Sequence, residues 1–316
     1  MTDQSIEVLT KSYRGDFEHC QLLCESMDRL VPENITHRVV VPQSDVKLFS
    51  RLATAQRTIV SEEDLLPSWF WRVPMPSPKW RRMLRLPRRD IYLTPYSPPV
   101  RGWIAQQIMK IAAAAASSAN IVVHVDSDNV FIRPMTAENI IRDGKVRIYR
   151  DPTPVGLDTH RRWQHVAGKL LGLPDREFYS GEYIDPLVVW KTSVVRGLTD
   201  RIESVSGTSW IKTLARTPHF AEYVLYGVYA DQVLGFDAAG LVPEDFSLCH
   251  SRWSDAFADE ADMQSFVEAV QPHHLTCLIQ STISHDSNLR RELFARVTEF
   301  ARIQDADPST DRFSSL

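Results

Sequence analysis

The residues best suited to chemistry are two aspartates one position apart, Asp126 and Asp128, with Ser127 between them. They directly follow 121–125, a run apolar at nearly every position and typical of a buried central strand of a parallel sheet. In open α/β sheets, ligands bind beyond the carboxyl ends of the strands, so both carboxylates can turn toward one hard cation. Oxygen ligands suit Mg²⁺ or Mn²⁺, whose shell substrate phosphates commonly complete. The alternative is a pair of turn-forming residues that cap the next segment.

The surrounding chain predicts alternating strands and helices. Short apolar runs indicate strands, and apolar residues at helical spacing indicate helices. In the first part of the chain we expect strands at 6–10, 37–41, 57–60 and 121–125, and helices at 17–30, 46–52 and 102–118. In the second part we expect strands at 146–149, 187–190, 246–250 and 275–280, and helices at 161–171, 194–205, 220–229, 260–270 and 288–303. Such alternation is the pattern of a parallel sheet with crossover helices.

One segment, 67–101, interrupts this pattern. It holds eight of the 19 prolines and three of the eight tryptophans, and its seven Arg and one Lys face a single acid, Asp90. Proline removes backbone donors, so an extended loop or irregular insertion is expected. The segment carries a net charge of +7 within a chain of −4, which leaves −11 for the remainder.

The composition is that of an ordinary globular protein, with 316 residues, 43% of them hydrophobic and 24% charged. A pI near 6.2 argues against a strongly basic nucleic-acid binder. No apolar run reaches the roughly 18 residues of a membrane helix. The N-terminus lacks the pattern of a signal peptide. We therefore expect a cytoplasmic protein whose four cysteines are reduced and mostly buried.

Residues 122–134, Val-Val-His-Val-Asp-Ser-Asp-Asn-Val-Phe-Ile-Arg-Pro, resemble the D-x-D segment of nucleotide-sugar glycosyltransferases of the GT-A fold. Segments 6–13, 103–110 and 220–227 are similar to uncharacterised bacterial members of that group. The likeness covers roughly residues 5–250, and the D-x-D segment is its specific part.

The resemblance implies an α/β fold that is GT-A-like, with a Rossmann-type, mostly parallel central sheet flanked by helices and the insertion at 67–101. A single catalytic domain would span 1–304. It would comprise a nucleotide-sugar-binding half, 5–134, and an acceptor-binding half, 135–304, followed by a flexible tail at 305–316.

The resemblance also implies roles for particular residues. Asp126 and Asp128, with Ser127 between them, would hold Mn²⁺ or Mg²⁺ on the diphosphate of a nucleotide sugar, with a UDP-sugar as the favoured donor. The ion would neutralise charge on the leaving nucleoside diphosphate. Lys110 is a candidate for the phosphates, with a solvated helix lysine as its alternative. The residues where the first strand would meet the nucleoside are Thr10, Lys11 and Ser12.

Members of this group often add a third metal ligand, and His250 is preferred here over His273, His274 and His285. An inverting transferase also needs a carboxylate base. Glu222 is the first candidate, because apolar and aromatic neighbours would raise its pKa, and Asp185 is the second. The alternatives are an ordinary core or surface histidine and ordinary helix or turn carboxylates. Retaining and inverting chemistry both stay open.

The insertion suits two kinds of anionic partner. Its basic residues and tryptophans could contact an anionic membrane surface, which would make the protein peripheral at the inner face of the membrane. Its arginines could instead bind a phosphorylated or acidic glycan acceptor. A solvated loop whose aromatics pack on the sheet edge is the alternative. The residues concerned are Trp69, Trp71, Trp80, Arg72, Arg81, Arg82, Arg85, Arg88 and Arg89.

The resulting hypothesis is a metal-dependent glycosyltransferase that uses a glycan or glycolipid acceptor, in cell-surface polysaccharide synthesis. Three alternatives stay open. The loop at 126–130 also fits haloacid-dehalogenase-like phosphatases, whose first Asp is a nucleophile, although theirs normally follows the first strand of the domain. A nucleotidyltransferase could share the metal and nucleotide half. A non-catalytic nucleotide- or glycan-binding protein would bind without turnover.

Overall fold

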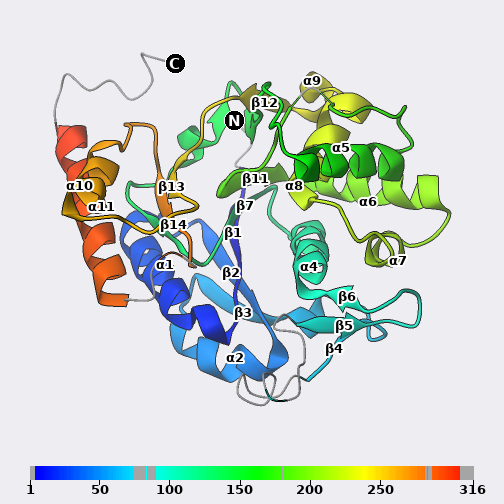
Figure 1. Ribbon diagram of the computed structural model, residues 1–316, viewed down its shortest axis with the longest axis horizontal. Helices are drawn as coiled ribbons and strands as arrows, with labels where there is room; N and C mark the ends of the chain where they lie inside the picture. The colour runs from blue at the N-terminus through cyan, green and yellow to red at the C-terminus, as the bar shows by residue number, and fades with distance from the viewer. Residues whose placement is uncertain are drawn as a thin grey trace.

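A five-stranded sheet forms the centre of the computed structural model, which describes residues 4–74, 83, 90–179, 181–281, 283 and 287–306 (Figure 1). Strands β1, β2, β3 and β7 run parallel, and the edge strand β11 is antiparallel to β7. The protein is therefore mixed α/β with a parallel-rich central sheet, as the alternating pattern predicted. In spatial order the strands are β11 (Leu187–Lys191), β7 (Ile121–Val125), β1 (Ile6–Lys11), β2 (Thr36–Val41) and β3 (Arg57–Ser61).

Helices cover both faces of this sheet (Figure 1). On one face, Val39 and Val41 of β2 pack with Cys20 and Cys24 of α1 (Phe17–Leu30) and with α2 (Gln43–Phe49). Val40 points to the other face and joins the main core with α4 (Gly102–Ala116) and α6 (Thr192–Ser206), because side chains alternate along a strand. All four cysteines are free and buried, as expected.

Two smaller sheets and further helices flank the centre. One sheet has the order β12–β10–β9, and the other has the order β13–β14–β8. The strands are β8 (Asn129–Phe131), β9 (Ile141–Arg142), β10 (Lys145–Tyr149), β12 (Leu241–Glu244), β13 (Cys249–Arg252) and β14 (Thr276–Ile279). The remaining helices include α5 (Asp158–Leu171), α7 (Trp210–Ala215), α8 (Glu222–Val228), a π-helix (Tyr229–Leu234), α9 (Phe236–Ala239), α10 (Glu260–Glu268) and α11 (Ser287–Ala306).

The two halves predicted for the domain share strands. Strand β11 comes from the 135–304 half and completes the central sheet beside β7. Strand β8 comes from the 5–134 half and pairs with β14. The expected strands and helices are found at similar positions. The strands that pair across the two halves, however, lie far apart along the chain.

The described part of the insertion is more regular than predicted. Strands β4 (Trp71–Arg72), β5 (Ile91–Leu93) and β6 (Val100–Arg101) form an antiparallel sheet. The Tyr92 hydroxyl donates to Glu62 Oε1 (2.9 Å), which anchors β5 to the end of β3. The basic residues and tryptophan predicted to contact a partner at Trp80, Arg81, Arg82, Arg85, Arg88 and Arg89 lie outside the described residues.

The C-terminal helix is longer than predicted. It continues to Ala306, so the first two residues of the predicted tail at 305–316 are helical, and 307–316 lie outside the described residues. The buried Arg133 donates through Nε to Asp305 (3.0 Å) and thereby ties this end of α11 to the segment after β8. In the part of the chain that the structure describes, no helix is both long and apolar enough to cross a membrane.

A close approach at Gly227 sets the position of α8. The ring of the buried Tyr183 lies directly against Gly227, and a Cβ at that glycine would overlap the ring. The Tyr183 hydroxyl donates to Asp231 (3.2 Å) in the next helical turn. Glycine at 227 therefore lets the segment that leads to Asp185 pack against the helix that carries Glu222.

We predict that Gly227→Ala destabilises the protein. Alanine normally improves a helix by about 1 kcal/mol over glycine. Here the overlap with Tyr183 costs more, and we expect a net loss of about 1–3 kcal/mol in urea unfolding. Gly156→Ala is the control, because nothing lies within 4 Å of its added Cβ. A Gly227→Ala variant as stable as the wild type would contradict the packing described.

Candidate functional site

The polar residues predicted from the sequence, apart from His250, lie at or near one edge of the central sheet. Strands β1 and β7 end there, at Lys11 and Val125. Antiparallel β11 begins there, because Leu187 pairs with Val125, so Asp185 and Asp126 share the edge. The chain builds outward from β1 through β2 to β3 and returns to β7 on the other side of β1. Such a switch point is where open α/β sheets bind ligands.

A tight turn carries the two aspartates. The backbone N–H and Nδ2 of Asn129 both donate to the carbonyl of Asp126 (3.1 and 3.2 Å). Asp128 Oδ2 accepts from the N–H of Ser281 (2.9 Å). Burial and the neighbouring charge of Asp126 raise the pKa of Asp128 to about 6. The aspartates therefore form a turn, and their carboxylates also repel one another.

Lys110 of α4 is the centre of a buried charge cluster. Its Nζ lies 2.8 Å from the Tyr223 hydroxyl, 3.0 Å from Asp126 Oδ1 and 3.3 Å from Glu222 Oε1. Burial alone would lower the pKa of Lys110, but Asp126, Tyr223 and Glu222 raise it well above its usual value. Lys110 is therefore a buried, paired cation, and the solvated-lysine alternative is wrong.

Glu222 belongs to the same cluster. It lies in the first turn of α8, where its N–H donates to Gln107 Oε1 (2.9 Å). Burial raises the pKa of Glu222, and Lys110 opposes that rise. The prediction that apolar surroundings raise its pKa is confirmed, and the helix-surface alternative is wrong.

Asp185 lies in a second buried polar group. The Ser247 hydroxyl donates to its Oδ1 (2.6 Å), and no hydrogen-bond partner of its Oδ2 is found among the described residues. Burial raises the pKa of Asp185 to about 7, against the opposing effects of Ser247 and Arg147. Ser247 also accepts from the N–H of Cys249, whose thiol contacts Asn129 (3.2 Å). A short polar chain thus links Asp185 to the aspartate turn.

The residues predicted to meet a nucleoside, Thr10, Lys11 and Ser12, do not all lie on the same face of the sheet. Arg57 donates to His37 Nδ1 (2.9 Å), so His37 donates through Nε2 to the fully buried Thr10 hydroxyl (3.0 Å). Lys11 points to the face of the sheet opposite to that of Thr10. Its Nζ lies 3.4 Å from Glu62 Oε2, and burial lowers the pKa of Lys11. The buried Ser12 hydroxyl has no hydrogen-bond partner among the described residues.

His250 lies apart from the aspartate pair. Its Nε2 donates to the Phe266 carbonyl (2.8 Å), and its ring packs on Phe266 and His274. Within the described ranges, no three or more His, Cys, Asp or Glu side chains are grouped so that they could hold a metal. The structure therefore does not bring His250 to Asp126 and Asp128, and the two carboxylates stay a predicted pair.

Sequence reasoning missed several residues of the site. Tyr223 and Gln107 contact Lys110 and Glu222, respectively. His124 shares a face of β7 with Asp126, packs edge-on against Trp190 (4.2 Å), and has both ring nitrogens buried without a hydrogen-bond partner among the described residues. Gln107 and His124 each interrupt an apolar run near a predicted site residue, and that signal was available in the sequence.

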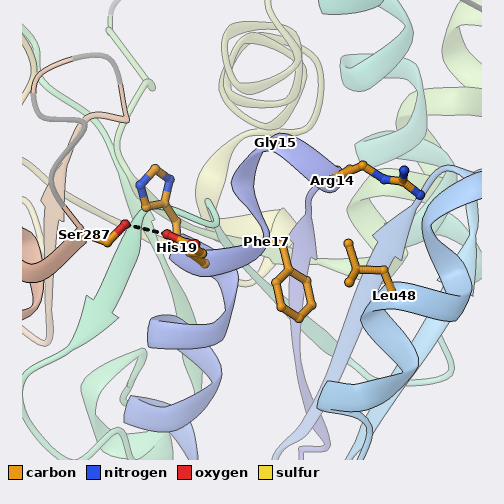
Figure 2. Close-up of a pocket in the computed structure, with 7 residues that line it drawn as sticks. Arg14, Gly15, Phe17, His19, Leu48 and Ser287 are labelled. Carbon is orange, nitrogen blue, oxygen red and sulfur yellow. Dashed lines mark hydrogen bonds between the residues drawn. The ribbon is translucent and has the colours of Figure 1, made fainter. Parts of the chain in front are cut away.

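A cavity of about 360 Å³ adjoins this edge but contains none of the predicted site residues. Figure 2 shows Phe17 and Leu48 in its wall, with Arg14 to one side and His19 and Ser287 to the other. The loop after β1 forms part of the wall, and Asp16 of that loop contributes to the raised pKa of Asp128. The cavity therefore shares the loop after β1 with the edge that carries Asp128.

Fold and site together define a mixed α/β protein with a buried, carboxylate-rich site at the edge of a mostly parallel sheet. The chain belongs to a family of unknown function, DUF6492, whose model matches residues 5–303. No curated protein matches the chain.

We predict that Lys110→Met destabilises the protein by about 3 kcal/mol at neutral pH, since it leaves the buried Glu222 beside the partly exposed Asp126 without their shared cation. The loss should be smaller in mild acid, where Glu222 takes up a proton. Urea unfolding measures both effects.

Two further variants test the cause of that loss. In the Lys110→Met background, Glu222→Gln should recover part of the stability because it removes one unpaired charge. The exposed Lys47 of α2 supplies the control, Lys47→Met, which should change little. Equal losses for Lys110→Met and Lys47→Met would refute the buried cluster.

We also predict a pH signature for Asp185. The folded state retains its proton up to about pH 7, whereas the unfolded chain releases it near its ordinary pKa of 3.8. The wild-type free energy of unfolding should therefore fall as pH rises between these values. The Asp185→Asn variant has no ionisable group at this position. Its free energy of unfolding should therefore rise relative to that of the wild type, by at most about 4 kcal/mol over this pH range. Unfolding curves measured at several pH values test this. The control is Asp200→Asn, a change at an exposed residue of α6. Parallel pH profiles of wild type and Asp185→Asn would count against the buried acid.

Proposed function

We propose that this protein is a metal-dependent glycosyltransferase with a GT-A-like arrangement, which transfers a sugar from a nucleotide-diphosphate sugar to a glycan or glycolipid acceptor. The observation that carries the proposal is the pair Asp126 and Asp128 at the switch-point edge of the sheet, beside the buried Lys110. The resemblance of 122–134 to a D-x-D segment supports the same reaction class.

The two carboxylates suit a divalent cation. They are hard oxygen donors, and the repulsion that contributes to the raised pKa of Asp128 would be relieved by a cation between them. When bound, Mn²⁺ or Mg²⁺ would stabilise the negative charge of the departing nucleoside diphosphate. We therefore assign Asp126 and Asp128 as the metal-holding residues and do not include His250.

Lys110 and the buried carboxylates supply the remaining chemistry. Lys110 fixes the orientation of Asp126 through a 3.0 Å contact and places a positive charge at the edge. A general base needs a pKa near the working pH, and burial shifts both Glu222 and Asp185 in that direction. Glu222 is the preferred base because it shares Lys110 with Asp126, and Asp185 is the second choice.

The nucleoside would lie at the end of β1. The loop after β1 lines the cavity there, and Arg14, Phe17 and Leu48 offer an apolar wall with one cation, whereas Lys11 points away toward Glu62. A planar base between apolar side chains and a polar rim is a common arrangement in small-molecule sites.

The described part of the insertion is compatible with a peripheral membrane role at the inner face of the membrane. Trp71 is 46% exposed on β4, and Trp favours the membrane interface. In that role the acceptor would be a lipid-linked or polysaccharide substrate made at that surface.

Thermal-shift measurements test the proposal. UDP, GDP, CMP and their sugars are added separately, with and without Mn²⁺. We expect at least one nucleoside diphosphate to raise the Tm in a Mn²⁺-dependent way, since ligand at about one hundred times its Kd stabilises by about 2.7 kcal/mol. Asp126→Asn and Asp128→Asn should remove the metal-dependent part.

The base assignment needs a second readout in the same series. Glu222→Gln should retain the nucleotide shift and lose the release of nucleoside diphosphate from the stabilising sugar donor. Asp200→Asn should retain both. The proposal fails if no nucleotide stabilises the wild type, or if the metal-dependent shift survives in Asp128→Asn.

A further inference from the structure

Two tryptophans from separate helices meet close to the candidate site. Trp103, in the first turn of α4, and Trp163, on α5, have ring centroids 5.8 Å apart at an angle of 31°. The ring of His160 lies 4.7 Å from that of Trp163. Trp103 is 38% exposed although it is a large aromatic side chain. We call Trp103, Trp163 and His160 the aromatic shelf.

The shelf connects directly to the charge cluster. Trp103, Gln107 and Lys110 follow one another at four and three positions, so they lie on one face of α4. Gln107 donates to the carbonyl of Trp103 (3.3 Å) and accepts from the N–H of Glu222. The rise of a helix puts Trp103 and Lys110 about 10 Å apart along α4, with Trp103 exposed at the outer end of this face and Lys110 buried at the inner end.

Neighbouring contacts hold the shelf in place. His160 Nδ1 lies 3.0 Å from a carboxylate oxygen of the buried Glu182. The side chain of buried Gln164, next to Trp163, bonds the Gly181 carbonyl (2.8 Å) and the Tyr179 N–H (3.1 Å). The exposed aromatic surface is therefore preorganised, which lowers the entropy cost of binding.

We propose that the aromatic shelf binds a sugar ring of the acceptor. That the bound sugar is the acceptor rests on the proposed function. The C–H face of a pyranose carries a partial positive charge that suits the negative face of an aromatic ring. Hydroxyl groups at the rim of the ring suit the polar His160–Glu182 pair. A sugar held on Trp103 would lie at the outer end of the α4 face that leads inward to the buried Glu222.

A carbohydrate fits this surface better than an anionic membrane does. Behind the shelf, the buried carboxylate of Glu182 contacts His160, so the polar group at the rim of the rings is an acceptor and not a cluster of cations. Its rings come from two helices and are fixed by hydrogen-bonded neighbours, whereas an interfacial anchor presents side chains that insert into the bilayer.

Saturation-transfer NMR with defined sugars tests the inference. Maltotetraose, cellotetraose and chitotetraose are titrated separately into the full chain, without nucleotide or metal. We expect at least one to bind, with the strongest transfer to ring C–H protons. Trp103→Ala and Trp163→Ala should each weaken binding roughly tenfold, and Trp103→Phe should retain most of it.

Matched variants separate stacking from misfolding. Trp253→Ala removes another exposed tryptophan, 45% exposed after β13, and should bind like the wild type. Asp126→Asn should also bind normally, because the titration contains no donor, so failure of the nucleotide test does not alter this result. Binding of none of the three sugars, or equal binding by the wild type and both alanine variants, would overturn the inference.

Discussion

The buried charge of Lys110 is the constraint on which the site depends. An ammonium group removed from water is tolerated only when its partners are close, and here two other elements supply them. The end of β7 provides Asp126, the first turn of α8 provides Glu222 and Tyr223, and α4 carries the lysine itself. The sheet edge, the crossover helix and α8 must therefore keep their relative positions, so the integrity of the site and that of the core depend on one another.

Similar pairing of buried polar groups recurs around the edge, but it does not offset burial at every group. Lys11 is held by Glu62, and the neutral His37 is held between Arg57 and Thr10. Asp128 and Asp185, by contrast, retain pKa values raised mainly by burial, although each accepts a hydrogen bond. Buried carboxylates with raised pKa values are candidates for a functional site. In the proposed function, a cation at Asp128 would supply the positive charge that the fold does not.

Local patterns predicted the elements well and their partners less well. Alternation along β2 and helical spacing in α1 depend on neighbours in sequence, so those elements were expected at nearly the observed bounds. Strand β11 was expected, but its antiparallel place beside β7 depends on a pairing across about sixty residues. In the same way, Asp126 was evident from its position after an apolar strand, whereas Tyr223 and Ser247 join the site only through tertiary contacts. Short strands such as β12 and β8 carry too few residues for a periodic signal.

Charge at the edge bears on what can bind there. The ionised forms of Asp126, Asp128 and Glu222 exceed the single positive charge of Lys110, and the chain outside 67–101 has a net charge of −11. A diphosphate brought to this edge alone would meet repulsion that one buried lysine, already engaged by three partners, does not offset. A divalent cation at the aspartates would reverse that balance. A neutral sugar on the aromatic shelf needs no such compensation, so donor and acceptor binding would respond differently to metal. The proposed function and the proposed sugar site would thus differ in their kind of recognition: electrostatic at the turn, and stacking at the N-terminal end of α4.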